Sequence, residues 1–295
     1  MRTLFFLGIC FFVIACQPKK TEENQRTQAK ETSIKALSYD LQHPVKVSEL
    51  PKALKEISGI TYVKDGQLAA INDEQGDLFL FDYRTGKVTD QRIWGQPGDY
   101  EDIAYLDGLF YVLRSDATLF KFSLDQTYQP GGTIVGGKRE LKSQQLSLPG
   151  DKNEVEGLCY DPRTKWFFIA AKETKGKPHH YVYFYDPQRQ ASWTGIILRK
   201  ANFEEEAGLS GKEVEFKPSA IAVHPKTQHV YILAANGHKL LVMNRQGGRF
   251  VSVEKLDPTV FEQPEGLCFA PDGTLFISGE GKKSSGKIWQ FAERQ

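Results

Sequence analysis

Short runs of hydrophobic residues, separated by turns that contain Gly, Pro and Asp, recur along most of this 295-residue sequence. Five segments repeat one order: a first run, a tight turn, and two further runs rich in β-branched and aromatic residues. Runs of this kind between such turns predict short β-strands. The five first runs are Glu56–Tyr62, Tyr100–Tyr105, Val155–Tyr160, Pro218–Val223 and Pro264–Phe269.

A fourth, less regular strand is predicted after the third run in three of the repeats. These strands are expected at Val88–Trp94, Ala191–Leu198 and Phe250–Leu256. Repeats of four antiparallel strands are typical of β-propeller blades. We therefore expect an all-β fold, a five-bladed β-propeller over residues 36–295. The alternative, a sandwich of loosely similar hairpins, does not explain matched motifs at matched positions.

The fifth repeat has no predicted outer strand of its own, because its third run, Lys287–Phe291, lies close to the last residue. The segment Ala36–Val47, before the first repeat, is expected to supply that strand. A closure of this kind holds the two ends of the propeller together and removes an open sheet edge.

The first residues have the layout of a secretory signal: Arg2, then an apolar run from Leu4 to Ala15 that ends at Cys16. The run is shorter than the ~20 residues that a membrane-spanning helix needs. Val13–Cys16 resembles the lipobox of bacterial lipoproteins, which implies cleavage after residue 15 and acylation of Cys16 with fatty acids such as palmitate. An ordinary signal peptide with an incidental cysteine is the alternative.

Residues 16–35 follow as a polar, charged stretch without an aromatic residue, and they are expected to form a disordered tether. Several acyl chains on Cys16 would anchor the protein stably to a membrane. Gln17, rather than Asp, follows the cysteine, and by analogy this favours the outer membrane of a Gram-negative cell envelope.

The composition excludes one class of partner. Acidic and basic residues nearly cancel, at a net charge of +1, so nothing favours nucleic acid. Two cysteines, Cys159 and Cys268, remain in the predicted propeller, each within a Glu-Gly-Leu-Cys-aromatic motif. Equivalent positions in two separated blades are too far apart for a disulfide, so both are expected to be free and buried.

Aligning the first runs gives a column of polar residues, which is expected to line the central channel: Ser58, Glu101, Glu156, Ser219 and Glu265. Carboxylates this close repel each other unless positive charge lies among them. A hard cation with oxygen ligands fits, and Ca²⁺ tolerates irregular oxygen sets better than Mg²⁺ does.

A second polar column, at the ends of the second runs, is expected to surround one mouth of the channel. It includes Asp73, Arg114, Lys172, Glu173 and Glu280. Arg114 and Lys172 could neutralise the glutamates directly, which would give an ion-pair network without a metal. The glutamates could also cap backbone amides, a purely structural role.

Four motifs of this sequence resemble those of the SdiA-regulated family of bacterial envelope proteins. Related Pro-Glu-Gly-Leu strands also occur in NHL-repeat propellers. The four motifs are Glu56–Tyr62, Ile71–Glu74, Asp99–Tyr105 and Val155–Leu158. The resemblance extends over residues 36–293 and implies a five-bladed propeller with a bound calcium ion. It suggests Glu101, Glu156 and Glu265 as ligands, with Asp73 as a fourth. Ser219 departs from the acidic pattern, which leaves part of the coordination to carbonyl groups or water.

No nucleophile motif is present, because Gly208–Gly211 lacks the Gly-x-Ser-x-Gly spacing and is read as a turn. Two functions remain. The first is a calcium-binding module of the envelope that recognises a protein or a small ligand. The second is a metal-dependent hydrolase of lactones or phosphoesters, with Asp73 or Glu173 activating water.

Overall fold

The computed structural model describes residues 35–131, 141–150, 153–245 and 248–294. The predicted signal peptide, Cys16 and all of the predicted tether except Lys35 lie outside these residues. In the part of the chain that is described, no helix has the length and apolar character needed to cross a membrane.

Five antiparallel sheets of four strands each form the propeller. In the first four blades the strands follow chain order from the inside outward. These blades are β2–β5 (Ile57–Lys64, Gln67–Asn72, Asp77–Asp82, Lys87–Ile93), β6–β9 (Tyr100–Leu106, Leu109–Arg114, Thr118–Ser123, Lys142–Gln145), β10–β13 (Asn153–Asp161, Trp166–Thr174, His180–Asp186, Ala191–Leu198) and β14–β17 (Lys217–Val223, Val230–Asn236, Lys239–Met243, Phe250–Lys255). One α-helix, α2 (Lys200–Ala207), lies between the third and fourth blades.

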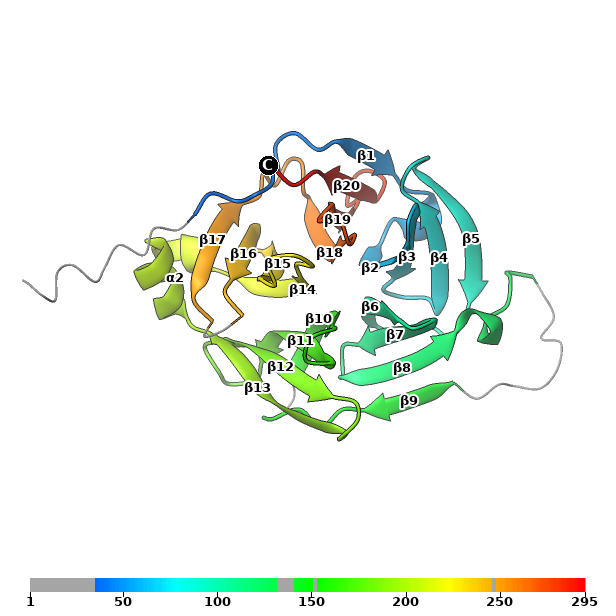
Figure 1. Ribbon diagram of the computed structural model, residues 1–295, viewed down its shortest axis with the longest axis horizontal. Coiled ribbons are helices and arrows are strands. Elements are labelled where there is room, and N and C mark those ends of the chain that lie inside the picture. Colours follow the sequence, from blue (N-terminus) through cyan, green and yellow to red (C-terminus); the bar gives the residue numbers. More distant parts are fainter. Residues whose placement is uncertain (1–34, 132–140, 151–152, 246–247, 295) are drawn as a thin grey trace, which may run out of the picture. The chain divides into compact units, whose positions relative to one another are not determined.

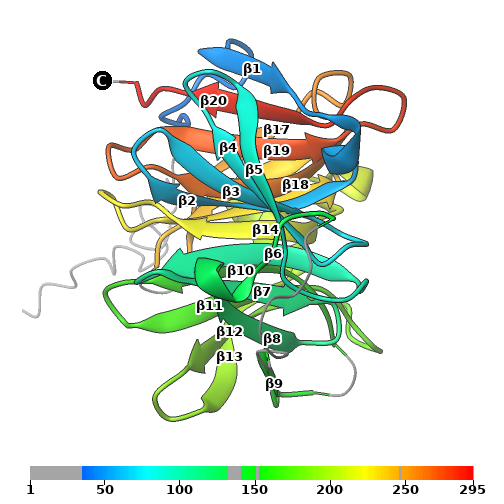
Figure 2. The ribbon, with the colours of Figure 1, turned by 90° about the vertical axis from the view of Figure 1, so that its right-hand side faces the viewer.

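The fifth blade combines the two ends of the propeller. Its strands are β18 (Gln263–Phe269), β19 (Leu275–Glu280), β20 (Lys287–Phe291) and, outermost, β1 (Lys46–Glu49). The first strand of every blade contacts the first strand of the next, and β18 contacts β2, so the five sheets form a closed ring about a central axis (Figures 1 and 2). The prediction of a five-bladed propeller is confirmed.

The prediction that an N-terminal strand closes the last blade is also confirmed, but its position was wrong. The closing strand is β1, which pairs with β20 so that Lys46 lies opposite Gln290 and Glu49 opposite Lys287. Most of Ala36–Val47 forms no strand, because Leu37 and Tyr39 are buried against the fourth and fifth blades. Their apolar side chains are used for packing between blades rather than for a sheet.

The hydrophobic core lies between neighbouring blades. Each of five clusters of buried side chains joins two adjacent sheets. Between the first and second blades, for example, Trp94 stacks on Phe122 with ring centroids 4.7 Å apart, and it contacts the Tyr100 ring at the same distance. Because each blade buries both of its faces, the apolar residues on both sides of each strand find partners.

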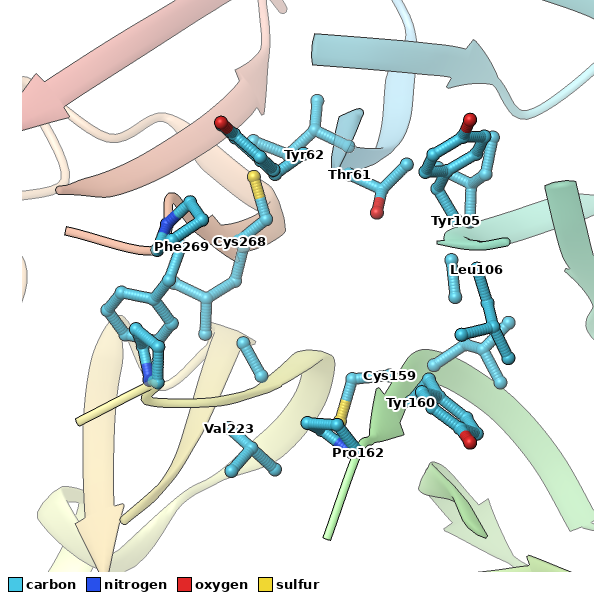
Figure 3. A pocket seen from close by; sticks show the side chains of 18 residues that line it. Thr61, Tyr62, Tyr105, Leu106, Cys159, Tyr160, Pro162, Val223, Cys268 and Phe269 are labelled. Atoms are coloured by element: carbon cyan, nitrogen blue, oxygen red, sulfur yellow. The ribbon is translucent and has the colours of Figure 1, made fainter. Parts of the chain in front are cut away.

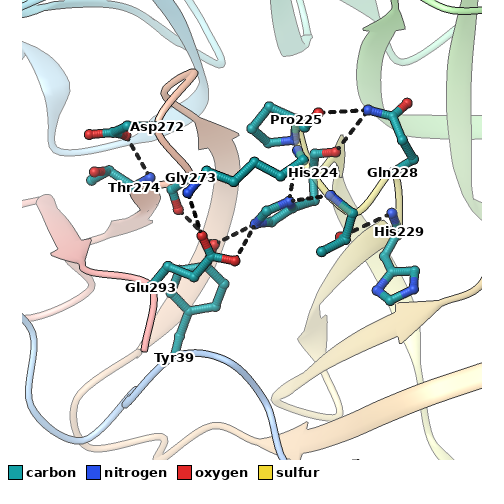
Figure 4. A network of polar contacts seen from close by, with 11 residues as sticks. Tyr39, His224, Pro225, Gln228, His229, Asp272, Gly273, Thr274 and Glu293 are labelled. Atoms are coloured by element: carbon teal, nitrogen blue, oxygen red, sulfur yellow. Dashed lines mark hydrogen bonds and ion pairs between the residues drawn. The ribbon is translucent and has the colours of Figure 1, made fainter. Parts of the chain in front are cut away.

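A buried polar network fixes the segment before β1 (Figure 4). The Tyr39 hydroxyl donates to the carbonyl of Gly273 at 2.6 Å and lies 2.9 Å from Nε2 of His224, which is completely buried. Glu293, beyond β20, reaches the same imidazole at 3.4 Å and the Lys226 ammonium at 2.8 Å. The two ends of the propeller are thereby joined to the fourth and fifth blades.

Candidate functional site at the acidic mouth of the channel

The two polar columns lie at one mouth of the channel because adjacent strands are antiparallel. The start of each first strand pairs with the end of the second strand: Tyr100 lies opposite Arg114, Glu154 opposite Glu173, and Gln263 opposite Glu280. We call this end of the channel the acidic mouth. The two aligned columns of the sequence therefore lie at the same end of the first and second strands.

A β-bulge occurs at the column residue of every first strand. In each blade the sheet register shifts at Ser58, Glu101, Glu156, Ser219 or Glu265. In the last four blades that residue has no partner on the neighbouring strand. A bulge leaves one residue out of the ladder and re-aims its side chain. The repeated bulge explains why these side chains can leave the sheet and face the axis.

Glu156 is the one glutamate of the column with a basic partner among the described residues. Its buried carboxylate forms an ion pair with the ammonium of Lys172. Burial raises the pKa of Glu156 to about 7 even though Lys172 favours its ionised form. Burial alone would lower the pKa of Lys172, but the ion pair outweighs burial and raises it. The ion-pair alternative is therefore correct for Lys172.

Arg114 does not take part in such a network. Its guanidinium binds Asp116 through two hydrogen bonds of 3.0 and 2.8 Å and also donates to Thr118. Asp116 in turn accepts a hydrogen bond from the backbone of Thr118, so this group serves the turn between β7 and β8. The prediction that Arg114 could neutralise the glutamates is wrong.

Glu101 and Glu265 lie in the column without a basic residue in contact among the described residues. Burial, with repulsion from Glu156 and Asp99, raises the pKa of Glu101 to about 9. Burial and repulsion from Glu156 and Glu280 raise the pKa of Glu265 to about 8. Both carboxyl groups therefore strongly favour their neutral form in the absence of a cation.

Asp73 and Ser58 add oxygen atoms that have no hydrogen-bond partner. Oδ1 of Asp73 and Oγ of Ser58 are buried and unpaired within the described residues. Burial raises the pKa of Asp73 to about 6, with repulsion from Glu56 as the next cause. Burial also raises the pKa of Glu280 to about 7, with Asp73 and Glu56 adding repulsion.

The structure adds two acidic residues that neither polar column contains. Glu56 and Asp99 act electrostatically on the carboxyl groups of Asp73 and Glu101, as does Glu74, which belongs to the second column of the sequence. Each of the two added residues flanks a residue of the two polar columns in the sequence, so a wider reading of those columns would have found them.

Two predicted channel residues are committed to other contacts. The Ser219 hydroxyl donates to the carbonyl of Pro264 at 2.8 Å, which joins the fourth blade to the fifth. Glu173 is exposed at the surface and pairs with Lys217. Neither side chain faces the unpaired oxygens of the acidic mouth in this arrangement.

The donor atoms of the acidic mouth suit a hard cation, since they are oxygens that belong mostly to carboxyl groups. As the side chains lie, no three His, Cys, Asp or Glu groups among the described residues are close enough to hold a metal ion. A cation bound here would need rotation of Glu101 or Asp73, together with backbone carbonyls or water. The unpaired Oδ1 of Asp73 and Oγ of Ser58 are the atoms that such a cation would satisfy.

The fold and the mouth define a class: a five-bladed β-propeller with an acidic channel. The sequence model of the SdiA-regulated family matches residues 32–282, and the chain belongs to that family. No curated protein matches the chain.

Solved structures with a similar fold include the glutaminyl cyclase of Myxococcus xanthus, at 14% identity and a TM-score of 0.56. That match covers 85% of this chain and 95% of the cyclase. A putative glucose dehydrogenase of Thermus thermophilus has 14% identity and a TM-score of 0.49, over 84% of this chain and 99% of its own. At these identities the likeness to the cyclase shows the fold alone.

Proposed function

We propose that this protein is a lipoprotein of the bacterial cell envelope whose propeller binds Ca²⁺ at the acidic mouth. The mouth then serves as a recognition surface for an envelope protein or a small ligand. Anchoring is through acylated Cys16, in the outer membrane of a Gram-negative cell, and residues 17–35 act as a spacer. In this proposal the cation is structural and completes the surface.

One observation carries the calcium proposal: buried acidic oxygens at the mouth lack compensating positive charge. Oδ1 of Asp73 has no partner among the described residues, and Glu101 carries a pKa raised to about 9. Leaving buried polar atoms unpaired is costly, and like charges held together need a counter-ion. A bound divalent cation removes both costs, whereas Lys172 is already engaged by Glu156.

Binding is favoured over catalysis by the size of the space at the mouth. A cavity of about 120 Å³ lies beside Glu156, Lys172, His238 and Glu265. Sites for drug-sized molecules occupy about 300–1,000 Å³, so this cavity holds water or an ion rather than a substrate of ordinary size. A larger partner would rest on the rim of the mouth.

The decisive experiment measures the metal content and melting temperature of the purified protein with EDTA, Ca²⁺ and Mg²⁺. We expect Ca²⁺ to raise the melting temperature saturably and Mg²⁺ to do so less. Glu101→Gln should abolish most of the calcium effect, whereas Glu173→Gln, which removes an exposed and paired carboxylate, should leave it intact. If each of the three proteins had the same melting temperature in EDTA as in Ca²⁺, the proposal would be contradicted.

Hydrolysis is the second candidate function, since the cavity brings three carboxyl groups, three ammonium groups and one imidazole together. A panel of lactones and phosphoesters tests it with the same protein samples. Calcium-dependent turnover that Glu156→Gln abolishes without a change in melting temperature would replace the binding proposal. Stabilisation by Ca²⁺ without turnover would support it.

The lipid anchor has its own test, which is independent of the channel. Wild-type protein should incorporate labelled palmitate and fractionate with membranes, and Cys16→Ser should do neither. Cys268→Ser is the matched control, because that thiol is buried in the propeller and is not a substrate for acylation.

A further inference from the structure

The mouth of the channel opposite to the acidic mouth is a bowl of about 340 Å³. It lies where the first strands end, and Figure 3 shows side chains from the first strands of all five blades around an open centre. We call it the apolar bowl. Its 18 lining residues include no Asp, Glu, Lys, Arg or His.

The repeat itself makes this end of the channel apolar. At or near the ends of the first strands lie Tyr62, Tyr105, Tyr160, Val223 and Phe269, all of them half-buried around the bowl. In three blades a turn proline also lines the bowl: Pro162, Pro225 and Pro271. Rigid rings and a proline-containing rim form a wall that needs little rearrangement to receive a ligand.

The two cysteines of the propeller lie in the wall of this bowl, on different blades (Figure 3). Both are free, and Cys268 is buried while Cys159 is half-buried, so the expectation that they do not pair is confirmed. Burial raises the pKa of both thiols well above the usual range. They therefore add neutral, polarisable surface rather than nucleophiles.

A few polar groups lie at the edge of the bowl. The hydroxyls of Tyr62, Tyr105 and Tyr160 and of Thr61 make no hydrogen bond to another described residue. They can donate to or accept from one polar group of a bound molecule. Outside the bowl, Asp107 places a negative charge near Tyr160, whereas Asp65, near Tyr62, is paired with Arg84.

We propose that the apolar bowl binds a small uncharged organic molecule, an aromatic ring or short acyl chain carrying one hydroxyl or carbonyl group. Its volume is in the range of small-molecule sites, which are mostly apolar with a few polar groups. A charged ligand would lose its hydration inside without gaining a counter-charge. This site is separate from the acidic mouth and does not depend on calcium.

The test uses three fluorinated probes of similar shape: 4-fluorobenzyl alcohol, 4-fluorobenzoate and 4-fluorobenzylamine. ¹⁹F NMR titrations with the purified protein should give saturable binding for the alcohol, at least tenfold tighter than for either charged probe. Val223→Trp, which fills the bowl, should weaken binding of the alcohol at least tenfold. Val45→Trp, the same change at a residue that is 64% exposed and outside the bowl, should leave it unchanged.

A second measurement covers the case in which Val223→Trp fails to fold. Val223→Phe, which adds less volume than tryptophan, should then bind the alcohol more weakly than the wild-type protein does in the same titration. Absence of saturable binding, equal binding of the charged probes, or unchanged binding by a folded Val223→Trp variant would overturn the proposal. If the bowl instead accepts an apolar side chain of a partner protein, the titration will show no saturation.

Discussion

Glu101 has the highest raised pKa of the carboxyl groups at the acidic mouth, so its ionisation is unfavourable in the folded protein. A carboxyl group with a raised pKa favours the folded state fully when the pH is below its ordinary pKa of 4.5. This contribution to the free energy of unfolding is lost as the pH rises through the folded-state pKa of about 9. In EDTA at pH 8, Glu101→Gln should therefore raise the melting temperature by roughly 2–4 °C, as expected for about 1 kcal/mol. Glu173→Gln should change it by less.

Thermal unfolding between pH 5 and 9 checks this prediction. The advantage of Glu101→Gln should shrink toward pH 5, because the unfolded wild-type chain then also begins to hold the proton of this carboxyl group. In saturating Ca²⁺ the order should reverse, since the variant loses a ligand. A variant that is less stable than wild type in EDTA at every pH would argue that Glu101 has a structural role.

Asp102 has a different role, although it is the next residue in the same strand. It is completely buried, and its two oxygens accept hydrogen bonds from the backbone of Ile103 at 2.8 Å and of Leu158, in the next blade, at 2.7 Å. Blade four has Ala220 at the equivalent position, so an alanine fits there. Asp102→Ala should cost about 2 kcal/mol, because it leaves buried amides without an acceptor.

Chemical denaturation measures this cost. Asp257→Ala is the matched control, since Asp257 also accepts a backbone hydrogen bond, from Thr259 at 2.8 Å, but is exposed. Water replaces its carboxylate, so the control should lose less stability. Equal losses for the two variants would mean that the buried hydrogen bond between Asp102 of β6 and Leu158 of β10 adds nothing to the free energy of unfolding beyond an exposed one.

At the scale of elements, the turn after β14 depends on a histidine. Nδ1 of His224 accepts the backbone amides of Lys226 and Thr227 at 3.2 and 3.1 Å, as the carboxylate of Asp161 does for the turn after β10. Burial lowers the pKa of His224, with Glu293 opposing the shift. Tyr39, Glu293, Lys226 and Tyr231 surround the ring.

Acid should therefore loosen this turn and the segment that Tyr39 fixes. A histidine with a lowered pKa contributes stability that is complete above 6.5 and declines as the pH falls below 6.5, because the unfolded chain takes up its proton first. His224→Asn keeps an acceptor near the position of Nδ1 and should flatten stability between pH 6.5 and 5. His43→Asn, at a histidine whose side chain is 80% exposed, should change the profile measured by thermal unfolding less than His224→Asn does.

The elements also show how far the sequence could predict the fold. The inner strands were found because each one repeats polar, small and aromatic residues in the same order. The strand β1 was misplaced because its four residues, with exposed Val47 and buried Ser48, lack the apolar alternation that marks the others. Helix α2 was not expected, since Phe203 is its one buried residue and its hydrophobic periodicity is weak.

At the scale of the whole molecule, one aligned repeat determines both mouths of the channel. The positions of the polar column at the start of the first strands could be aligned from the sequence, but the contacts of Arg114, Ser219 and Glu173 depend on partners in turns or on other blades. The apolar bowl was visible in the same alignment, as aromatic residues at the end of four first strands. It was missed because apolar positions in a strand are ordinarily assigned to the core.

Ring closure by β1 is the property of the whole propeller that a covalent bond can test. Glu49 and Lys287 lie directly opposite each other on β1 and β20, with Glu49 exposed and Lys287 half-buried. The double substitution Glu49→Cys with Lys287→Cys should form a disulfide that encloses nearly the whole propeller. For a long loop, the entropy lost by the unfolded chain predicts a large gain, which the strain usual in engineered disulfides lowers to about 2–4 kcal/mol over the reduced form.

Denaturation of the oxidised and reduced protein measures the gain, and Glu49→Cys alone should show none. An oxidised double variant no more stable than its reduced form would mean that β1 leaves β20 readily and that the fifth blade is held by the packing of Leu37 and Tyr39 instead.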